Sequence, residues 1–408
     1  MQSSTTNSRF RRYSSRQSGH TSGTNPGWPH TTAALHARIP AKLLALCTLA
    51  GAGIYYLAFP AAKEQHLNST TFVPYLVTSK EAISPTSFIL TVKPQAAPKD
   101  APGLLPYSLL WTRGLWSLEF KQPEVQIARH YTPLPSISTT DGQDGSLSFY
   151  IRAIADGEMS NYLSRLKKGD EAWLRGPHTG FDLTTRLGTK KHLVFLAGGT
   201  GMVPGMQAAS TVLEANQQTH VTLLWAVRRR EEVQSGGPPE QGLSWWNFWS
   251  SPAPAPLESA VNLPSPITQR LEELQAKYPE RLTIRIGVDE ENSQFREHHI
   301  AEALRAEVPR MTTDLISTRP CPFHDQDTHE SISEFQPPGL SCLCAPMDGN
   351  PPGKNLFMVS GPDGFVSHFA GPKVWAGGQH TQGSIGGVAA QLRKKNPQLD
   401  KEWLVLKL

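Results

Sequence analysis

Residues 192–201 read HLVFLAGGTG, an uninterrupted apolar run that ends in glycines, and a helical pattern, GMQAASTVLEAN, follows at 205–216. Apolar runs and helical patterns then alternate: VTLLWAV (221–227), ITQRLEELQAKY (267–278), LTIRIGV (282–288), IAEALRAEV (300–308) and NLFMVSGP (355–362). Strands that are apolar throughout and alternate with helices are typical of a parallel sheet covered on both faces. We therefore predict an α/β domain with a parallel sheet over 190–408, which binds a dinucleotide beyond the carboxyl ends of its strands.

The chain before this domain has a different pattern. Short apolar or alternating segments are separated by turn residues: FVPYLVTSKEAI, TSFILTVKP, LWSLEF, VQIARHY and LSFYIRAI. One helix is indicated from Ser160, because Tyr162, Leu163 and Leu166 have helical spacing. Many short strands with one helix predict an all-β domain, a six-stranded antiparallel barrel over 70–187.

The composition sets limits on both domains. The chain has 408 residues, of which Gly and Pro make up 67, and only four are Cys. A chain of this length exceeds one core, and so few Cys exclude a small disulfide-stabilised fold. Residues 1–63 hold seven Lys or Arg and no acid, whereas the remaining 345 residues hold 32 basic and 35 acidic side chains. Because the basic excess belongs to the leader, binding of nucleic acid through bulk charge is not expected.

The leader predicts targeting and a membrane anchor. Residues 1–40 are rich in Ser, Thr and Arg, which is typical of a mitochondrial presequence; a disordered or cytosolic basic tail is the alternative. Residues 43–59, LLALCTLAGAGIYYLAF, carry no charge and are just long enough to span a bilayer. We expect one transmembrane helix over 41–59, with a secretory signal peptide or a buried core helix as alternatives.

Two Pro-rich stretches, 233–266 and 310–353, show neither helix nor strand periodicity and are expected to be disordered inserts. Trp245, Trp246, Phe248 and Trp249 within the first insert either dock on a membrane or partner or pack on their own domain.

The second insert gathers thiols and imidazoles at Cys321, His324, His329, Cys342 and Cys344. A Cys-x-x-His followed by Cys-x-Cys is not a standard zinc spacing, and the segment between them has the composition of a disordered region. No metal site is therefore expected; zinc or contact with haem is the weaker alternative.

Three predicted strands end in residues suited to a nucleotide. In the run Gly198, Gly199, Thr200 and Gly201, the three glycines have no Cβ where a strand meets a helix, so a pyrophosphate can approach the backbone amides there. Tight strand–helix packing is the alternative explanation. Asp289 ends a second strand, and the sequence Gly361-Pro362-Asp363-Gly364 ends a third.

The barrel carries two further candidate patterns. Arg129, Tyr131 and Thr132 offer a cation, a ring and a hydroxyl to one planar ligand that bears phosphate, although ordinary strand alternation explains them as well. Ser160 is expected to be the N-cap of the helix and, with its free amides, to form a second phosphate cradle; simple capping is the alternative.

In combination these patterns resemble the ferredoxin reductase-type flavoproteins, in particular the NADH–cytochrome b5 reductase-like branch. The resemblance covers 72–308 and 354–375 and implies FAD as the cofactor and NADH or NADPH as the electron donor. The residues that match its motifs are R-x-Y-[ST] at Arg129, Tyr131 and Thr132; G-x-M-S at Gly157, Met159 and Ser160; A-G-G-T-G-x-x-P at Gly198, Gly199, Thr200, Gly201 and Pro204; G-P at Gly361 and Pro362; and Arg152 after Ile. The resemblance implies that Asp289 bears on nucleotide choice and that Thr132 and Ser360 are the catalytic residues.

Three departures accompany the resemblance: Ser360 replaces the Cys before Gly-Pro, His130 replaces a Pro, and Asp363 replaces a second Pro. The leader, the single span and the inserts are most similar to fungal mitochondrial flavoproteins of cytochrome c import and haem attachment. The sequence thus predicts a single-pass reductase of the mitochondrial inner membrane that passes electrons from NAD(P)H through FAD to haem or a haem protein, such as cytochrome c or its apo form. The alternative is an FAD-binding assembly factor for haem attachment without nucleotide turnover, which Ser360 favours.

Overall fold

The computed structural model describes residues 67–95, 111–112, 114–136, 145–235, 253–261, 263–305, 320–335, 339–344 and 352–408. The predicted presequence (1–40), the predicted span (41–59) and the aromatic residues at 245–249 lie outside these ranges. No helix of the described part of the chain is long and apolar enough to cross a membrane.

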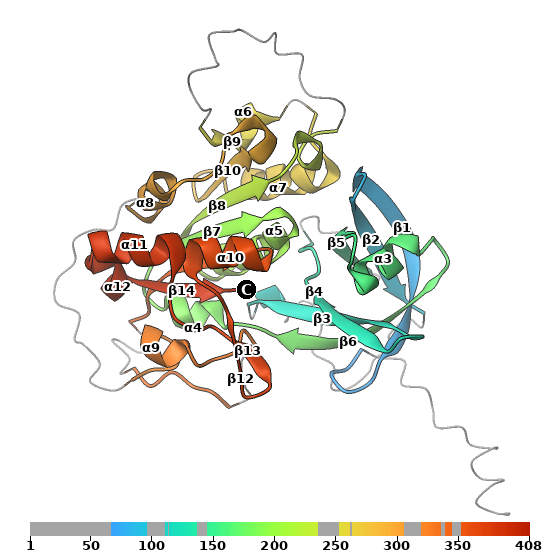
Figure 1. Ribbon diagram of the computed structural model, residues 1–408, viewed down its shortest axis with the longest axis horizontal. Coiled ribbons are helices and arrows are strands. Elements are labelled where there is room, and N and C mark those ends of the chain that lie inside the picture. The colour runs from blue at the N-terminus through green and yellow to red at the C-terminus, as the bar shows by residue number, and fades with distance from the viewer. Residues whose placement is uncertain are drawn as a thin grey trace, which may run out of the picture. The chain divides into compact units, whose positions relative to one another are not determined.

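The first sheet is antiparallel and has six strands (Figure 1). Its strands are β1 (Val73–Ser84), β2 (Ser87–Pro94), β3 (Trp116–Gln122), β4 (Ile127–Tyr131), β5 (Leu147–Arg152) and β6 (Glu171–Thr179), in the order β4-β3-β6-β1-β2-β5. Just beyond β4, the amide of Leu134 donates to the carbonyl oxygen of Ser148 in β5 over 2.8 Å, which joins the two edges of the sheet. The predicted antiparallel six-stranded domain is therefore present.

Alternation of side chains builds the core of this sheet. Val73, Tyr75 and Val77 of β1 point to the same side as Leu118 and Phe120 of β3, and all five are at most 1% exposed. Helix α3 (Glu158–Arg165) closes the core through Leu163, which is fully buried.

The second sheet is mixed rather than purely parallel. Its order is β14-β11-β7-β8-β10-β9, in which β7 (His192–Gly198), β8 (His220–Val227), β10 (Leu282–Val288), β11 (Asn355–Ser360) and β14 (Trp403–Lys407) are parallel. The edge strand β9 (Ala255–Pro256) runs antiparallel to β10. The prediction of a parallel sheet is correct for five strands and wrong for the short edge strand β9, which is part of the first insert.

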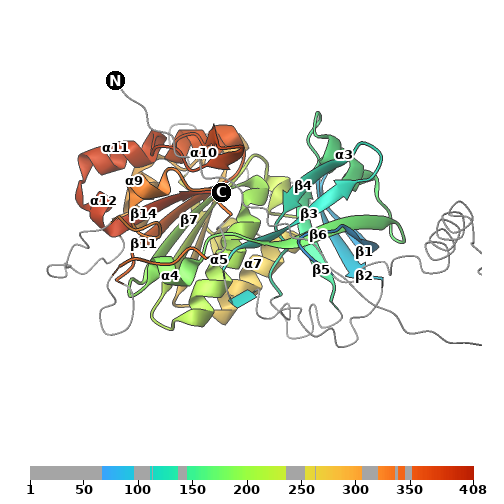
Figure 2. The ribbon, with the colours of Figure 1, turned by 90° about the horizontal axis from the view of Figure 1, so that it is seen from below.

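Helices cover both faces of this sheet, as Figure 2 shows. On one face lie α4 (Leu183–Leu187), α5 (Met202–Ala215) and α7 (Pro266–Lys277); on the other lie α8 (Glu297–Arg305), α10 (Asp363–Ala370), α11 (Gly387–Lys395) and α12 (Gln398–Glu402). Helix α7 begins where the sequence dictates, because the side chain of Ser265 accepts a hydrogen bond from the amide of Thr268 and Pro266 follows it.

Part of the first insert is ordered. Its two ends, residues 233–235 and 263–265, are joined by backbone pairing and are called the neck here. Gln234 forms an antiparallel β-bridge with Pro264, the amide of Ser235 donates to the carbonyl oxygen of Leu263, and the amide of Ser265 donates to that of Val233. Beyond the neck, β9 and helix α6 (Leu257–Ala260) belong to the structure. The expected disorder of 233–266 is thus wrong for residues 233–235, 253–261 and 263–266.

The second insert also contains ordered structure. Helix α9 (Gln326–His329) lies within it, and Cys321, Phe323 and His329 are at most 2% exposed. After β11 and α10, a small hairpin of β12 (Val374–Ala376) and β13 (Gln379–Thr381) contacts the insert, because Ser333 bridges Thr381. The expected disorder of 310–353 is therefore wrong for 320–335, where apolar and aromatic side chains find buried positions.

Candidate functional site

A cavity of about 1000 Å³ lies where the antiparallel sheet meets the carboxyl ends of the parallel strands. Ligand pockets in proteins commonly have 300–1000 Å³. Most of the residues that the sequence predicts for the site line this cavity: Tyr131, Thr132, Arg152, Ser160, Gly198, Gly199, Thr200, Gly201, Pro204, Asp289, Ser360, Gly361 and Pro362. The structure thus brings together residues that the sequence distributes over more than 200 positions.

Three of the predicted residues do not line this cavity. Arg129 is exposed at the end of β4, and its Nη1 donates to the carbonyl oxygen of the neighbouring Ala128. Met159 is 3% exposed and packs in the core of the barrel domain, and Gly157 is the N-cap of α3. These three stay predictions as cofactor-binding residues.

The expectation that Ser160 caps the helix is wrong. Helix α3 begins at Glu158 and its N-cap is Gly157, so Ser160 lies inside the first turn. The Oγ of Ser160 accepts a hydrogen bond from the amide of Ile154 at 3.1 Å and donates to the carbonyl oxygen of Gly157 at 3.0 Å. The hydroxyl therefore fixes the loop before the helix instead of capping an amide of the helix.

The glycine loop after β7 is held closely in place. Gly199 has φ +56° in a short 3-10 turn, and its carbonyl oxygen accepts a hydrogen bond from Nε1 of the buried Trp225 at 2.9 Å. A Cβ on Gly201 would lie 2.6 Å from the carbonyl oxygen of Ser360, so only a glycine lets the loop approach the end of β11 this closely. Helix α5 starts directly after this loop, and its first amides form an N-terminus suited to an anionic group.

Arg152 forms an ion pair that the sequence did not indicate. Its Nη2 contacts a carboxylate oxygen of Glu232, whose side chain is 4% exposed. Arg152 closes β5, whereas Glu232 follows β8, so the pair joins the barrel to the nucleotide domain at the cavity. Sequence reasoning missed Glu232 because it stands next to the Pro-rich insert and looks like part of a solvated loop.

A second bridge between the two domains comes from Gln207 of helix α5, which is 1% exposed. Its Nε2 donates to the carbonyl oxygen of Pro133 at 3.0 Å, and its Oε1 accepts from the amide of Trp116 at 3.1 Å. Because Pro133 follows the predicted flavin motif, this amide fixes the distance between that motif and the glycine loop before α5.

The two residues before Thr132 differ in their surroundings. Burial raises the pKa of Tyr131 to about 12, with Arg129 acting in the opposite direction, so its hydroxyl stays a neutral hydrogen-bonding group at the cavity. His130 turns toward Glu119 and His178, and its ring packs on Phe335 of the second insert with centroids 4.6 Å apart. Burial lowers the pKa of His130 although Glu119 acts to raise it, which favours the neutral ring.

The three arginines after β8 do not act alike. Arg228 lines the cavity together with Asp289, whereas Arg230 binds Glu291 through Nε at 2.6 Å and Arg229 contacts Glu231 at the surface. Burial raises the pKa of Asp289, with Arg228 acting in the opposite direction. One cation and one carboxyl group of opposite charge are therefore available to a ligand at this end of the cavity.

The residues present fit FAD. Arg152 lines the cavity from the barrel side, and its guanidinium lies 3.5 Å from the position that a Cβ on Gly199 would take, so it offers a cation to a phosphate of the cofactor. Tyr131 and Thr132 line the same cavity from the barrel side and offer a ring and a hydroxyl to a flat, polar ring system.

Comparison with known proteins agrees with this geometry. Residues 112–182 match the family model for the oxidoreductase FAD-binding domain. The chain is 34% identical over 147 residues to the cytochrome c mitochondrial import factor CYC2 of Saccharomyces cerevisiae; the aligned region covers 32% of this chain and 39% of that protein. It is 27% identical over 199 residues to NADH-cytochrome b5 reductase 1 of Laccaria bicolor, covering 48% of this chain and 60% of that protein.

Among solved structures, the chain is similar to the CS-b5R domains of human Ncb5or in the NAD+ form, with a TM-score of 0.45, 13% identity, and coverage of 84% of this chain and 71% of that chain. It is also similar to the cytochrome b5 reductase domain of Ulva prolifera nitrate reductase, with a TM-score of 0.43, 15% identity, and coverage of 84% and 99%. The resemblance drawn from the sequence motifs is confirmed: residues 112–182 match the oxidoreductase FAD-binding domain, and the chain that carries them is similar to the NADH-cytochrome b5 reductases.

Proposed function

We propose that this protein is an FAD-dependent reductase that takes electrons from NADH or NADPH and passes them to a haem-type acceptor. The observation that carries the proposal is the shared cavity, in which Tyr131 and Thr132 of the barrel domain face the glycine loop and Ser360 of the other domain. Similarity to NADH-cytochrome b5 reductases and to a cytochrome c import factor supports this choice of donor and acceptor.

When bound, FAD supplies the redox chemistry, accepting a hydride and releasing electrons singly. The chain orients the reactants. Tyr131 and Thr132 would hold the flavin ring and its ribityl region, and Arg129 the FAD phosphates, with Arg152 beside them. Gly157, Met159 and Ser160 would hold the pyrophosphate, and the loop before α5 the nicotinamide nucleotide. Ser360, which is 6% exposed at the end of β11, would lie beside the reacting rings as a small hydroxyl that donates or accepts a hydrogen bond.

The first experiment asks whether Arg129 holds the FAD phosphates. Its exposed side chain stands next to the cavity residues and lies close enough to Tyr131 to affect that pKa. We expect Arg129→Ala to weaken FAD binding by about 1.5–3 kcal/mol, roughly ten- to hundredfold, while the fold is retained. Arg165→Ala, a change of the same kind at an exposed position of α3 outside the cavity, is the control. Stoichiometric flavin in purified Arg129→Ala protein would contradict this role.

Anaerobic mixing with each nucleotide tests the reductase itself. Because Arg228 and Asp289 face the cavity together, attraction and repulsion of a 2′-phosphate oppose each other, and we expect NADH and NADPH to differ by less than about a hundredfold, or 2.7 kcal/mol, in kcat/KM. Arg228→Ala should shift the preference toward NADH, and Asp289→Asn toward NADPH. A protein whose flavin absorbance neither nucleotide bleaches is not a reductase.

That last outcome would favour the second candidate, an FAD-binding assembly factor for haem attachment to apocytochrome c. Ser360 is the observation in its favour, because a hydroxyl lacks the polarisable sulfur that the resemblance places beside the nicotinamide. The relative named as a cytochrome c import factor supports the same reading. Retention of FAD without nucleotide turnover, together with capture of haem or apocytochrome c, would establish it.

We further propose that residues 41–59 anchor the protein in the mitochondrial inner membrane as a single span. The uncharged run at 43–59 and the basic, acid-free leader support this location. Two arginines introduced into 43–59 should release the protein from carbonate-washed membranes, since each costs about 2.5–3.5 kcal/mol at the centre of a span. The same two arginines placed within 20–30 are the control; continued retention of the first variant would contradict the anchor.

A further inference from the structure

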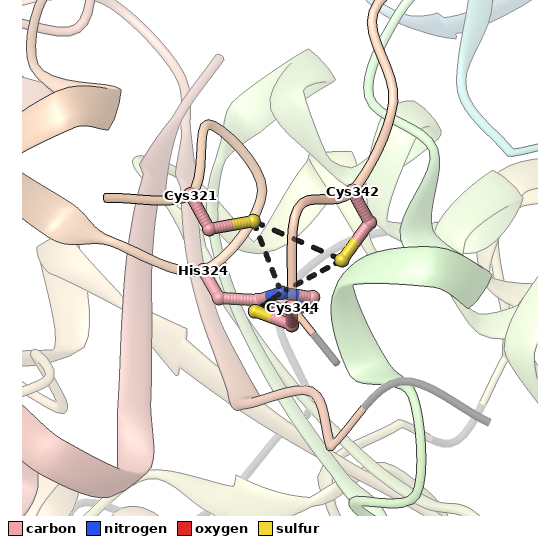
Figure 3. Close-up of side chains that lie close together, drawn as sticks. All are labelled: Cys321, His324, Cys342 and Cys344. Atoms are coloured by element: carbon pink, nitrogen blue, oxygen red, sulfur yellow. Dashed lines mark hydrogen bonds between the residues drawn. The ribbon is translucent and has the colours of Figure 1, made fainter. Parts of the chain in front are cut away.

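Four side chains of metal-binding types converge in the second insert, and none of them lines the cavity described above. Cys321 and His324 approach from one turn, and Cys342 and Cys344 from a separate loop segment, as Figure 3 shows. One ligand atom of each residue lies within 4.8 Å of the other three. His329, which the sequence places in the same group, is not part of this cluster, because its Nδ1 lies 3.4 Å from the carbonyl oxygen of Pro322.

The distances match those that a tetrahedral zinc ion requires. With Zn–S of about 2.3 Å and Zn–N of about 2.0–2.1 Å, tetrahedral angles separate two sulfurs by roughly 3.8 Å and a sulfur from a nitrogen by roughly 3.6 Å. The Sγ atoms of Cys321 and Cys342 are 3.8 Å apart. Nδ1 of His324 lies 3.6, 3.5 and 3.3 Å from the Sγ atoms of Cys321, Cys342 and Cys344.

The imidazole is oriented as a ligand. Nε2 of His324 lies 3.0 Å from the carbonyl oxygen of Thr185, to which it must donate, because a carbonyl only accepts. Its proton is therefore on Nε2, and the lone pair of Nδ1 points at the three sulfurs. A backbone carbonyl on the second ring nitrogen is the usual partner of a metal-binding histidine.

The surroundings also suit a site with net negative charge. Cys321 is 2% and His324 is 6% exposed, and the amide of Leu343 donates to Sγ of Cys321 over 3.4 Å. Arg186 is fully buried beside them, with Nη1 donating to the carbonyl oxygen of Phe323, while among the described residues its Nε and Nη2 have no hydrogen-bond partner. Zn²⁺ with three thiolates and a neutral imidazole has a net charge of about −1, which would offset this buried guanidinium.

We propose that Cys321, His324, Cys342 and Cys344 bind one structural Zn²⁺ ion. On binding, Zn²⁺ replaces the three thiol protons, and the four protein ligands leave no position open for substrate. The ion joins the two segments of the insert to each other, and His324 links them to helix α4 through the carbonyl of Thr185. The insert also carries Phe335, which packs on His130, so the site would hold an aromatic side chain against the barrel domain next to its predicted flavin motif.

The test is metal analysis of the full-length chain, purified in detergent without chelator. We expect about one zinc ion per chain by mass spectrometry of the metals, a loss of most of it in Cys321→Ser and Cys342→Ser, and full retention in Cys47→Ser. Cys47 is the one remaining cysteine and lies outside the described residues, so it gives the same substitution away from the cluster.

If the serine variants do not fold, exchange of the wild-type protein with Co²⁺ provides the second measurement. Three thiolates and one imidazole should give tetrahedral cobalt bands at wavelengths longer than the absorption of oxidised flavin. Wild-type protein without stoichiometric zinc, iron with sulfide in its place, a disulfide between Cys321 and Cys342, or zinc loss in Cys47→Ser would each overturn the proposal. Neither measurement depends on flavin binding or turnover, so the result is independent of the proposed reductase function.

Discussion

Replacing Gly201 by alanine tests whether close contact between the glycine loop and the end of β11 shapes the cavity. The added Cβ would lie 2.6 Å from the carbonyl oxygen and 2.7 Å from the carbonyl carbon of Ser360, whereas ordinary contacts begin near 3.4 Å. Both neighbours are backbone atoms, so no side chain can rotate away, and the loop must move by about 0.8 Å. Forcing a methyl group into a packed region costs about 1–3 kcal/mol, and the upper half of that range applies here.

We expect Gly201→Ala to lower the melting temperature by about 4–6 °C, at roughly 2 °C per kcal/mol for a domain of this size. The same shift moves the loop away from Ser360, so the KM for the nicotinamide nucleotide should rise with little loss of bound FAD. Differential scanning calorimetry and steady-state kinetics measure the two effects.

Gly364 supplies the control, since it lines the same cavity but a Cβ there would meet no atom within 4 Å. It lies in the first turn of α10, where alanine is the better helix former by up to about 1 kcal/mol. Gly364→Ala should therefore melt at or above the wild-type temperature. If Gly201→Ala also melts there and keeps its KM, the close approach of loop and strand does not exist as described.

Two further outcomes follow from buried polar groups. Gln207→Leu should destabilise the protein by about 2–4 kcal/mol in chemical unfolding, because the amide of Trp116 and the carbonyl of Pro133 both lose their hydrogen-bond partner. Gln217→Leu, the same change at an exposed position, should have almost no effect. Equal stability of the two variants would show that Gln207 does not bridge the domains. Burial, with Arg186 as the lesser cause, lowers the pKa of His329 to about 3, so below pH 6.5 the unfolded state binds a proton that the folded state does not. Stability should thus fall by about 2 kcal/mol between neutral pH and pH 5, and His329→Leu should lose that part of the pH dependence; parallel pH profiles would contradict the assignment.

The sheets were largely predictable because their patterns are local. The apolar runs that become β7, β8, β10 and β11 carry their own length and periodicity, and the glycines after β7 mark the point where a ligand approaches. The sequence does not indicate strand β6, because Arg175, Gly176 and Pro177 interrupt its alternation; pairing with β1 and β3 stabilises the strand where its own propensity is weak. Strand β14 has only five residues, too few for periodicity to distinguish them from a loop.

The least predictable features depend on residues far apart in the sequence. The spacing within Cys321–His324 and within Cys342–Cys344 says nothing about the two pairs meeting, because they come from separate segments that lie together only in the folded insert, where Phe323 and His329 are buried. Glu232 becomes a buried carboxylate only through Arg152 of another domain. Such pairings are set by tertiary packing, and no local pattern encodes them.

The neck at Gln234 and Pro264 has a consequence for how this fold can vary among related chains. Because backbone hydrogen bonds join residues 233–235 to residues 263–265, the positions of the parallel strands do not depend on how many residues the insert has between these two segments. Lengthening a loop whose ends are already fixed is thermodynamically cheap, at about 0.6 kcal/mol for each doubling. The position between the neck and β9 is therefore one where evolution can insert or lengthen a segment, and where an engineer can graft a reporter domain, while β9 stays paired with β10.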